Sequence, residues 1–146
     1  MDSGKSLRET LKGKPSLAVK VMIKGLDNPP PNFRIDMDSF GFVKGNWCIG
    51  CAATVALQEI TGHVFSTTEI IDDRHLALGL QFLDVAEFEL ALDSFRVSDT
   101  RQLGKFCGVK MPAPAKHLKA IFHKDYWPTC RQDYVDYQKQ LEESGL

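Results

Sequence analysis

Pairs of residues that start helices recur after residue 65 of this chain of 146 residues, and they constrain its fold more than any other feature. In a capping box, two residues three positions apart each satisfy a free backbone N–H at the start of a helix. Three pairs have this spacing: Ser66 with Glu69, Asp84 with Glu87, and Thr129 with Gln132. Gly62 and Gly108 are placed to end helices. The sequence therefore predicts a mostly α-helical protein, a compact helical bundle that forms a single domain over residues 1–146.

The pattern near the N-terminus is different, and a run of prolines at residues 29–31 divides it into two segments. No helix can continue through this run of prolines, because proline lacks the backbone donor that a helix needs. Residues 15–24 before it suit either a strand or a helix, and the proline at their start and the glycine after them favour a helix. Residues 33–42 after it alternate apolar and polar side chains, as an extended strand does. A small β-hairpin is therefore expected near residues 33–44.

The composition is that of an ordinary globular protein, with 43% hydrophobic and 25% charged residues. The first residues lack the apolar run of a secretory signal, and no stretch approaches the ~20 apolar residues that cross a membrane. We therefore expect a cytoplasmic protein that does not enter membranes. Because the cytoplasm is reducing, the four cysteines are expected as free thiols, metal ligands or a redox pair rather than as structural disulfides.

The net charge of −1 conceals three blocks of like charge. Residues 1–24 carry six basic and two acidic side chains, residues 59–99 carry two and nine, and residues 101–131 carry seven and one. Blocks of opposite sign can pair within the fold, align a partner or a second copy of the chain, or remain solvated helix faces. We expect a protein partner or a homo-oligomer held through these charge-segregated surfaces. Nucleic acid is not expected, because no basic stripe carries interleaved aromatic residues.

The motif Trp47-Cys48-Ile49-Gly50-Cys51 runs into the apolar segment 52–60, which places two cysteines at the predicted start of a helix. There the helix dipole and the free N–H groups favour the thiolate, the form of cysteine that reacts and binds metal. On a helical wheel for residues 48–61, Cys48 and Cys51 lie away from the apolar face. They can still be small hydrophobic side chains that a second neighbour covers. Three chemical hypotheses stand beside that interpretation.

The first hypothesis is thiol–disulfide exchange. The motif resembles the Trp-Cys-x-x-Cys of thioredoxin-like oxidoreductases, and the resemblance covers these five residues. It implies that Cys48 attacks as the nucleophile and that Cys51 is the resolving thiol. The chain departs from the family elsewhere, because no clear apolar strand leads into the motif and Pro112 lacks the strand context of the family's cis-proline.

The second hypothesis is a zinc site, because Cys48 and Cys51 have the spacing of half a set of zinc ligands. No second Cys-x-x-Cys is present to supply the other half. The residues that could complete the set from a distance are Cys107, Cys130, His117 and His123.

The third hypothesis is a cysteine hydrolase. Residues 48–53 are similar to the segment around the catalytic cysteine of papain-like peptidases. The similarity implies Cys51 as the nucleophile, His117 or His123 as the base, and Asn46 near the oxyanion. The chain departs from that family at Gly45, which stands where the family has a glutamine.

Two further pairs of residues have a spacing that suits a metal ion. Asp36 and Asp38 would share one face of a strand, and Asp72 and His75 would lie one helical turn apart. Neither group has a further ligand nearby in the sequence, so solvated acidic surface is the favoured interpretation of both.

These features favour a non-enzymatic protein–protein interaction module, because no catalytic set converges beyond Cys48 and Cys51. The charge blocks and the C-terminal aromatic residues are what such a role would use, although a core or packing seam is the favoured interpretation of these aromatic residues, which are Tyr126, Trp127, Tyr134 and Tyr137. The alternative is a thiol–disulfide redox protein that works through the two cysteines. The sequence therefore favours a protein that is not an enzyme. No cofactor is expected, and zinc is the one cofactor that Cys48 and Cys51 would suit.

Overall fold

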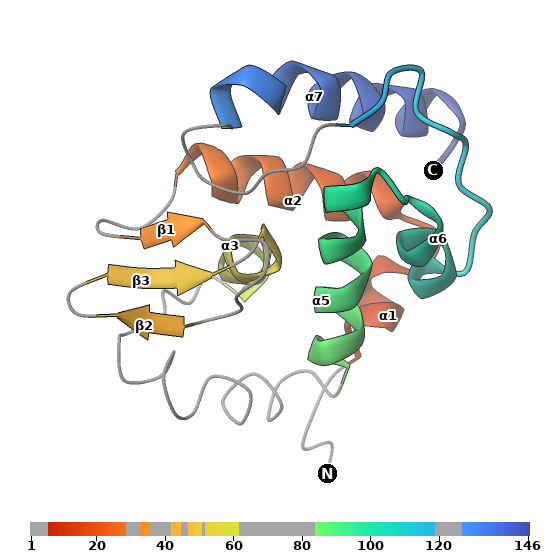
Figure 1. Ribbon diagram of the computed structural model, residues 1–146. Helices are drawn as coiled ribbons and strands as arrows, with labels where there is room; N and C mark the ends of the chain where they lie inside the picture. The colour runs from red at the N-terminus through yellow and green to blue at the C-terminus, as the bar shows by residue number, and fades with distance from the viewer. Residues whose placement is uncertain are drawn as a thin grey trace, which may run out of the picture.

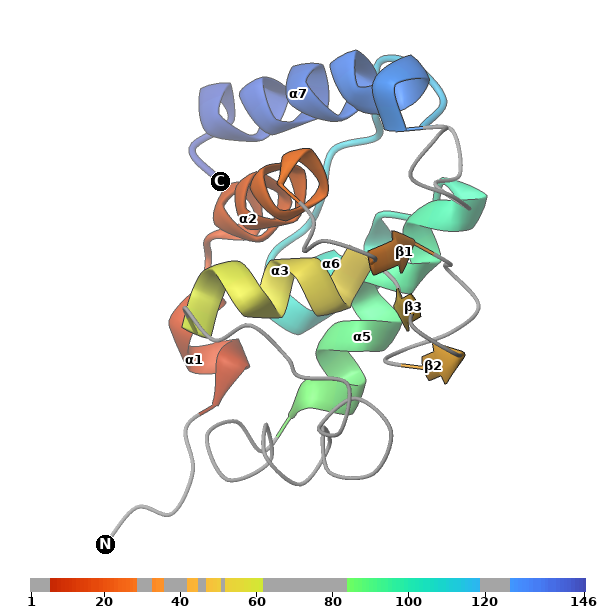
Figure 2. The same cartoon turned by 90° about the vertical axis from the view of Figure 1, so that its left-hand side faces the viewer.

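The computed structural model describes residues 6–28, 33–35, 42–44, 47–50, 52–61, 84–118 and 127–146. These residues form a mostly helical protein with a small sheet at one side (Figures 1 and 2), so the prediction of a mostly helical fold is confirmed. In chain order the elements are α1 (Leu7–Leu11), α2 (Pro15–Asp27), β1 (Phe33–Ile35), β2 (Phe42–Lys44), β3 (Trp47–Gly50), α3 (Ala52–Thr61), α5 (Val85–Asp93), the 3₁₀-helix η2 (Ser94–Val97), α6 (Arg101–Cys107) and α7 (Trp127–Glu143).

Helix α2 lies at the centre of the helical part, with α3 against one side and α7 along another (Figures 1 and 2). It begins at Pro15, a position where the missing N–H costs no helical hydrogen bond. Residues 15–24, which suited both a strand and a helix, therefore lie in a helix. Its buried apolar side chains form a single stripe: Ala18, Val19, Met22, Ile23 and Leu26.

Helices α2 and α3 approach each other at backbone distance, and Gly25 makes this approach possible. A Cβ atom at this position would lie 2.6 Å from the carbonyl oxygen of Val55 and 2.7 Å from its carbonyl carbon. Non-bonded carbon and oxygen atoms do not pack so closely, so any side chain at Gly25 would force the two helices apart.

Helix α1 is fastened to the start of α5 by Asp84. The Asp84 carboxylate accepts hydrogen bonds from the Ser6 hydroxyl at 3.0 Å, from the Leu7 N–H at 2.7 Å and from the Arg8 N–H at 2.9 Å. The sequence predicted that Asp84 caps its own helix. Asp84 does occupy the N-cap position of α5, but its side chain makes no cap there and instead satisfies the free N–H groups of α1. Capping patterns within one segment do not reveal such a distant acceptor.

The other predicted helix limits have different outcomes. Helix α5 begins at Val85, as predicted, and α6 ends at Gly108, whose φ of 72° is the left-handed conformation of a glycine cap. Helix α7 begins at Trp127, so the predicted start at Thr129 was wrong. Pro128 lies in its first turn, where proline is tolerated, and was the signal for the earlier start. Outside the described residues lie Gly62, Ser66 and Glu69.

The sheet has the order β1-β3-β2, with β3 in the middle. β1 runs parallel to β3 and β2 runs antiparallel to it, so Cys48 of β3 pairs with Phe33 and with Val43. The expected β-hairpin near residues 33–44 therefore has a different form. β1 and β2 both lie in that segment, but the antiparallel pair is β2 with β3. The prediction missed this pairing because it assigned Cys48 to a helix.

Aromatic side chains pack where η2 meets α7. The ring of Tyr134 contacts Phe95 at 6.0 Å between centroids and Trp127 at 5.7 Å. Trp127, Tyr134 and Tyr137 are all buried. These C-terminal aromatic residues, which suited either a core or an interface, therefore belong to the core.

Candidate functional site

The structure places Cys48 in the central strand of the sheet rather than in a helix. Helix α3 begins at Ala52, so the helical wheel drawn for residues 48–61 started too early. The reason is that β3 has hydrogen-bonded partners on both sides, and Gly50 is a poor helix former. Cys51 lies outside the described residues, directly after β3 in the sequence and directly before α3.

The two remaining cysteines are core residues. Cys107 and Cys130 are free thiols, and each is 1% exposed. Burial raises the pKa of Cys107 to about 11, and the Cys130 thiol donates a hydrogen bond to the carbonyl oxygen of Trp127 at 3.6 Å. Both cysteines therefore pack as small apolar side chains in the thiol form.

The other residues of the zinc and hydrolase hypotheses are not brought together in the described part of the chain. His117 is exposed on the segment that follows α6. Within the described residues, no group of three or more His, Cys, Asp or Glu side chains could hold a metal ion. Several predicted residues lie outside that part of the chain: Asp36, Asp38, Gly45, Asn46, Asp72, His75 and His123.

Ion pairs within the fold connect the charge blocks. Arg8 of the first basic block pairs with Glu87 of the acidic block at 2.6 Å, and Lys24 pairs with Glu59 at 3.7 Å. The second basic block meets the acidic block where Arg101 bonds its near neighbour in sequence, Asp99, at 3.2 Å. Part of the charge segregation is therefore neutralised inside one molecule, as the first of the three interpretations expected.

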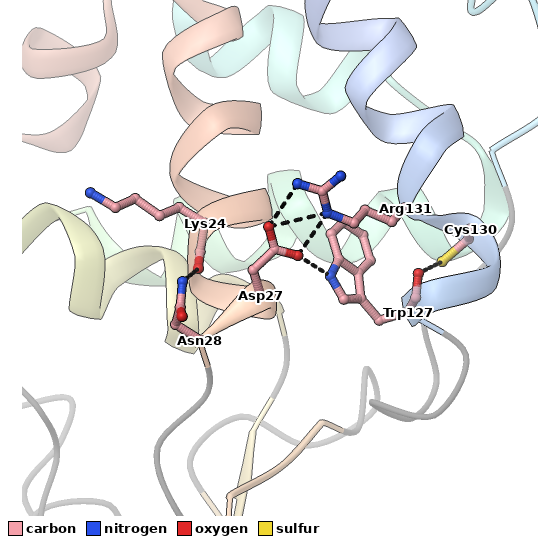
Figure 3. Close-up of polar contacts among 6 residues, drawn as sticks. All are labelled: Lys24, Asp27, Asn28, Trp127, Cys130 and Arg131. Carbon is pink, nitrogen blue, oxygen red and sulfur yellow. Dashed lines mark hydrogen bonds and ion pairs between the residues drawn. The ribbon is translucent and has the colours of Figure 1, made fainter.

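Asp27, the last residue of α2, fixes the start of α7 (Figure 3). Its carboxylate accepts hydrogen bonds from the Trp127 indole N–H at 2.7 Å and from Nε and Nη2 of Arg131 at 2.8 and 2.9 Å. The Arg131 guanidinium, helped by the Trp127 indole, holds the pKa of Asp27 below its usual value, although partial burial opposes this. The two donors also offset the unfavourable position of a carboxylate at the C-terminal end of a helix.

The middle of α7 holds the segment that follows α6. The Tyr137 hydroxyl donates a hydrogen bond to the carbonyl oxygen of Pro112 at 2.8 Å. The Gln140 side chain donates to the carbonyl oxygen of Ala113 at 2.8 Å and accepts from the N–H of Ala115 at 3.3 Å. Burial raises the pKa of Tyr137, so this hydroxyl stays neutral and keeps its proton for the bond. An irregular segment is thus fixed against a helix.

An open pocket of about 370 Å³ lies between this segment and α7. We call it the α7 groove, and its lining residues are Pro114, Ala115, Lys116, Asp133, Asp136, Tyr137, Lys139, Gln140 and Glu143. Its lining includes Tyr137 and Gln140, which the preceding contacts hold in place, and it also includes acidic and basic side chains, most of them exposed, which we call its rim. The groove can therefore offer both apolar contact and charge pairing to a chain that enters it.

No protein-family model matches this chain, and no curated protein or solved structure shows significant similarity to it. In the ranges that the structure describes, no helix is both long enough and apolar enough to cross a membrane.

Sequence reasoning missed the α7 groove. Tyr137 was grouped with the C-terminal aromatic residues, but neither Gln140 nor residues 112–116 gave a sign of their mutual contact. An amide side chain that bonds two backbone groups of an irregular segment has no local sequence pattern. The one available signal was the pair of prolines at Pro112 and Pro114, which predicts an extended segment that needs external partners for its backbone.

Proposed function

We propose that this protein is a non-enzymatic module that binds another protein, and that a segment of the partner docks in the α7 groove. The observation that carries the proposal is the groove itself, an open pocket of about 370 Å³ between α7 and the segment that Tyr137 and Gln140 hydrogen-bond to it. A binding surface gains affinity when its residues are already ordered, because less conformational entropy is lost on binding.

The rim of the α7 groove suggests the chemistry of the docked segment. Asp133, Asp136 and Glu143 contribute three carboxylates, and Lys116 and Lys139 contribute two ammonium groups. A partner segment that carries basic side chains, with an acidic residue among them, would complement this rim. The contribution of such exposed pairs is mainly to specificity and to the rate of association.

Site-specific photo-crosslinking tests the proposal. A photoreactive amino acid is placed at Lys139 in the α7 groove and, in a matched control, at Lys20 on α2; both lysines are exposed. We expect a discrete protein adduct from position 139 in cells, and none of that mass from position 20. The adduct is identified by mass spectrometry, and the partner is then purified for a direct measurement of affinity.

Neutral substitutions in the rim give the quantitative test. Asp133→Asn together with Asp136→Asn keeps the shape of the groove and removes two charges. We expect the purified partner to bind this variant about tenfold more weakly, because two rim charge pairs are lost. Equal adducts from positions 139 and 20, or unchanged affinity in the double variant, would overturn the proposed docking site.

A thiol–disulfide redox protein is the second candidate, and one feature favours it. Only Cys51 separates the last residue of β3 from the first residue of α3, and a helix N-terminus lowers the pKa of a cysteine placed there. Intact mass of the native protein, without reductant and again after alkylation, tests this candidate. A loss of two hydrogens that is removed by reductant and absent in Cys48→Ser would support it. Zinc quantified on the same sample tests the metal hypothesis for Cys48 and Cys51.

A further inference from the structure

The two basic blocks of the sequence meet where the turn between α1 and α2 packs against the end of α6. The N–H of Gly13 in that turn donates a hydrogen bond to the carbonyl oxygen of Cys107 at 2.9 Å. Helices α1 and α2 both contact α6, and Figure 1 shows α1 beside α6 on the side of the molecule away from the sheet. Segments separated by about two thirds of the chain are thus joined at one surface.

Lysines flank both partners of that hydrogen bond. Lys12 and Lys14 lie on either side of Gly13, and Lys105 and Lys110 lie on either side of Cys107. All four are exposed, and within the described part of the chain none of them takes part in an ion pair. We call these four residues the lysine patch.

The other basic residues of the same blocks are of two kinds. Arg8, Lys24 and Arg101 each pair with a carboxylate of the acidic block, whereas Lys20 and Lys116 are exposed and form no ion pair within the described residues. The lysine patch differs from these single lysines because the Gly13–Cys107 hydrogen bond joins the two segments that carry its four lysines.

Basic side chains outnumber acidic ones around the patch. Glu9 lies one turn before Lys12, and Asp99, which bonds Arg101, also interacts with Lys105. The C-terminal ends of α1 and α6, at Lys12 and Gly108, add partial negative charge. The four lysines therefore leave an excess of basic side chains at this surface.

We propose that the lysine patch is a second docking surface of this protein, and that it binds an acidic segment of a partner protein. The proposal rests on the proposed function, because it assumes that the protein binds other proteins. The acidic character follows from charge complementarity, and the charge acts over only about 8 Å at cellular ionic strength. Glutamate or aspartate side chains must therefore lie in the docked segment itself.

A protein segment fits this patch better than a nucleic acid does. The net charge of −1 gives no long-range attraction for a polyanion. Phe106, the aromatic residue next to Lys105, is 2% exposed and cannot stack on a base.

Fluorescence anisotropy tests the proposal with a labelled peptide of alternating glutamate and glycine, and with a single-stranded oligonucleotide of the same charge. The patch variant is Lys12→Glu, Lys105→Glu. The control variant has the same net charge and reverses two exposed lysines of α2, Lys20 and Lys24, which belong neither to the patch nor to the α7 groove. A second patch variant with glutamine at the same two positions serves if the glutamates disturb the helix ends.

We expect the patch variant to bind the acidic peptide about tenfold more weakly than the parent, and the control variant to bind it within about twofold. Binding should also weaken as salt is raised. Equal loss in the two variants, tighter binding of the oligonucleotide, or no binding of the peptide would overturn the inference. These outcomes leave the crosslink at position 139 unaffected, so failure here is distinct from failure of the proposed function.

Discussion

The two sides of α2 are held in opposite ways. Against α3, the helix has no side chain at the point of closest approach, where Gly25 lies on the backbone of Val55. Against α7, it is held by directed contacts, which are the bonds from Trp127 and Arg131 to Asp27. The contact between α2 and α3 requires that residue 25 has no side chain, whereas the contact between α2 and α7 includes hydrogen bonds that require particular side chains.

This difference bears on function. Substitution cannot vary the contact between α2 and α3 gradually, because any residue larger than glycine at position 25 would overlap the backbone of Val55. Helix α7 packs a buried face into the core, and in addition it forms several separate hydrogen bonds, each of which can be weakened alone. The α7 groove lies on this adjustable side, so substitutions there can loosen the site without unfolding the chain. The following substitutions test the comparison, beginning with the largest expected effect.

Gly25→Ala should lower the free energy of unfolding by about 2–3 kcal/mol, because its Cβ would overlap the Val55 carbonyl group. Helix propensity alone predicts the opposite, a gain of about 1 kcal/mol. Urea denaturation followed by circular dichroism measures the difference, with Lys20→Ala on the exposed side of α2 as control. A stabilised Gly25→Ala variant would show that the two helices are not in backbone contact.

Asp27→Asn should cost about 1.5 kcal/mol at neutral pH, because the charged hydrogen bonds to Arg131 are lost. The amide can still accept the Trp127 N–H, so the fold should persist. The same denaturation assay measures the change, and Arg131→Gln is the matched variant, because it removes the guanidinium and leaves the bond from the Trp127 indole in place. Unchanged stability in Arg131→Gln would mean that the guanidinium contributes nothing.

The effect of Asp27 should also depend on pH. Its pKa is lower in the folded protein than in the unfolded chain, so its stabilisation is present above the unfolded value of 3.8 and is lost as pH falls through the folded value. The gap between parent and Asp27→Asn should therefore close in acid. Burial raises the pKa of Asp93, which acts in the opposite direction, but this contribution cancels in the difference. A gap that stays constant below pH 4 would contradict the ion pair.

Tyr137→Phe should cost about 1 kcal/mol, because it removes the hydrogen bond to the Pro112 carbonyl and leaves that acceptor to solvent. The sharper readout is amide hydrogen exchange at residues 113–116, which should become faster while exchange in α2 stays slow. Exchange that rises equally in both would mean that the segment and the core open together, and that the α7 side is not separately adjustable.

The Arg8–Glu87 ion pair should have the smallest effect. Both side chains are more than half exposed, so a double-mutant cycle of Arg8→Ala and Glu87→Gln should give a coupling of about 0.5 kcal/mol that falls with salt. A coupling several times larger would show that charge pairing between the blocks contributes to the fold as much as helix packing does.

Sequence patterns were sufficient for much of the helical part. Pro15 and Gly108 marked helix limits correctly, because the conformational restrictions of proline and the freedom of glycine act locally. Sequence patterns failed where a residue distant in the sequence determines the local structure. Asp84 caps α1 rather than α5, and Cys48 lies in a strand because it has partners on two sides.

The candidate sites depend even more on distant contacts. The two basic blocks were visible in the sequence, but it is the Gly13–Cys107 hydrogen bond and the contacts of α1 and α2 with α6 that show that they adjoin. The α7 groove was invisible, since it depends on a helix and an irregular segment that Gln140 joins. The role of Cys48 and Cys51 stays a prediction.

The central claim is that this protein acts by binding and not by thiol chemistry. The most direct measurement is the affinity of the crosslinked partner for a Cys48→Ser, Cys51→Ser double variant whose helical content matches that of the parent. We expect the same affinity within about twofold, because the residues that line the α7 groove include no cysteine. Loss of partner binding in the folded double variant, together with a reversible disulfide in the parent, would contradict the claim and favour the redox alternative.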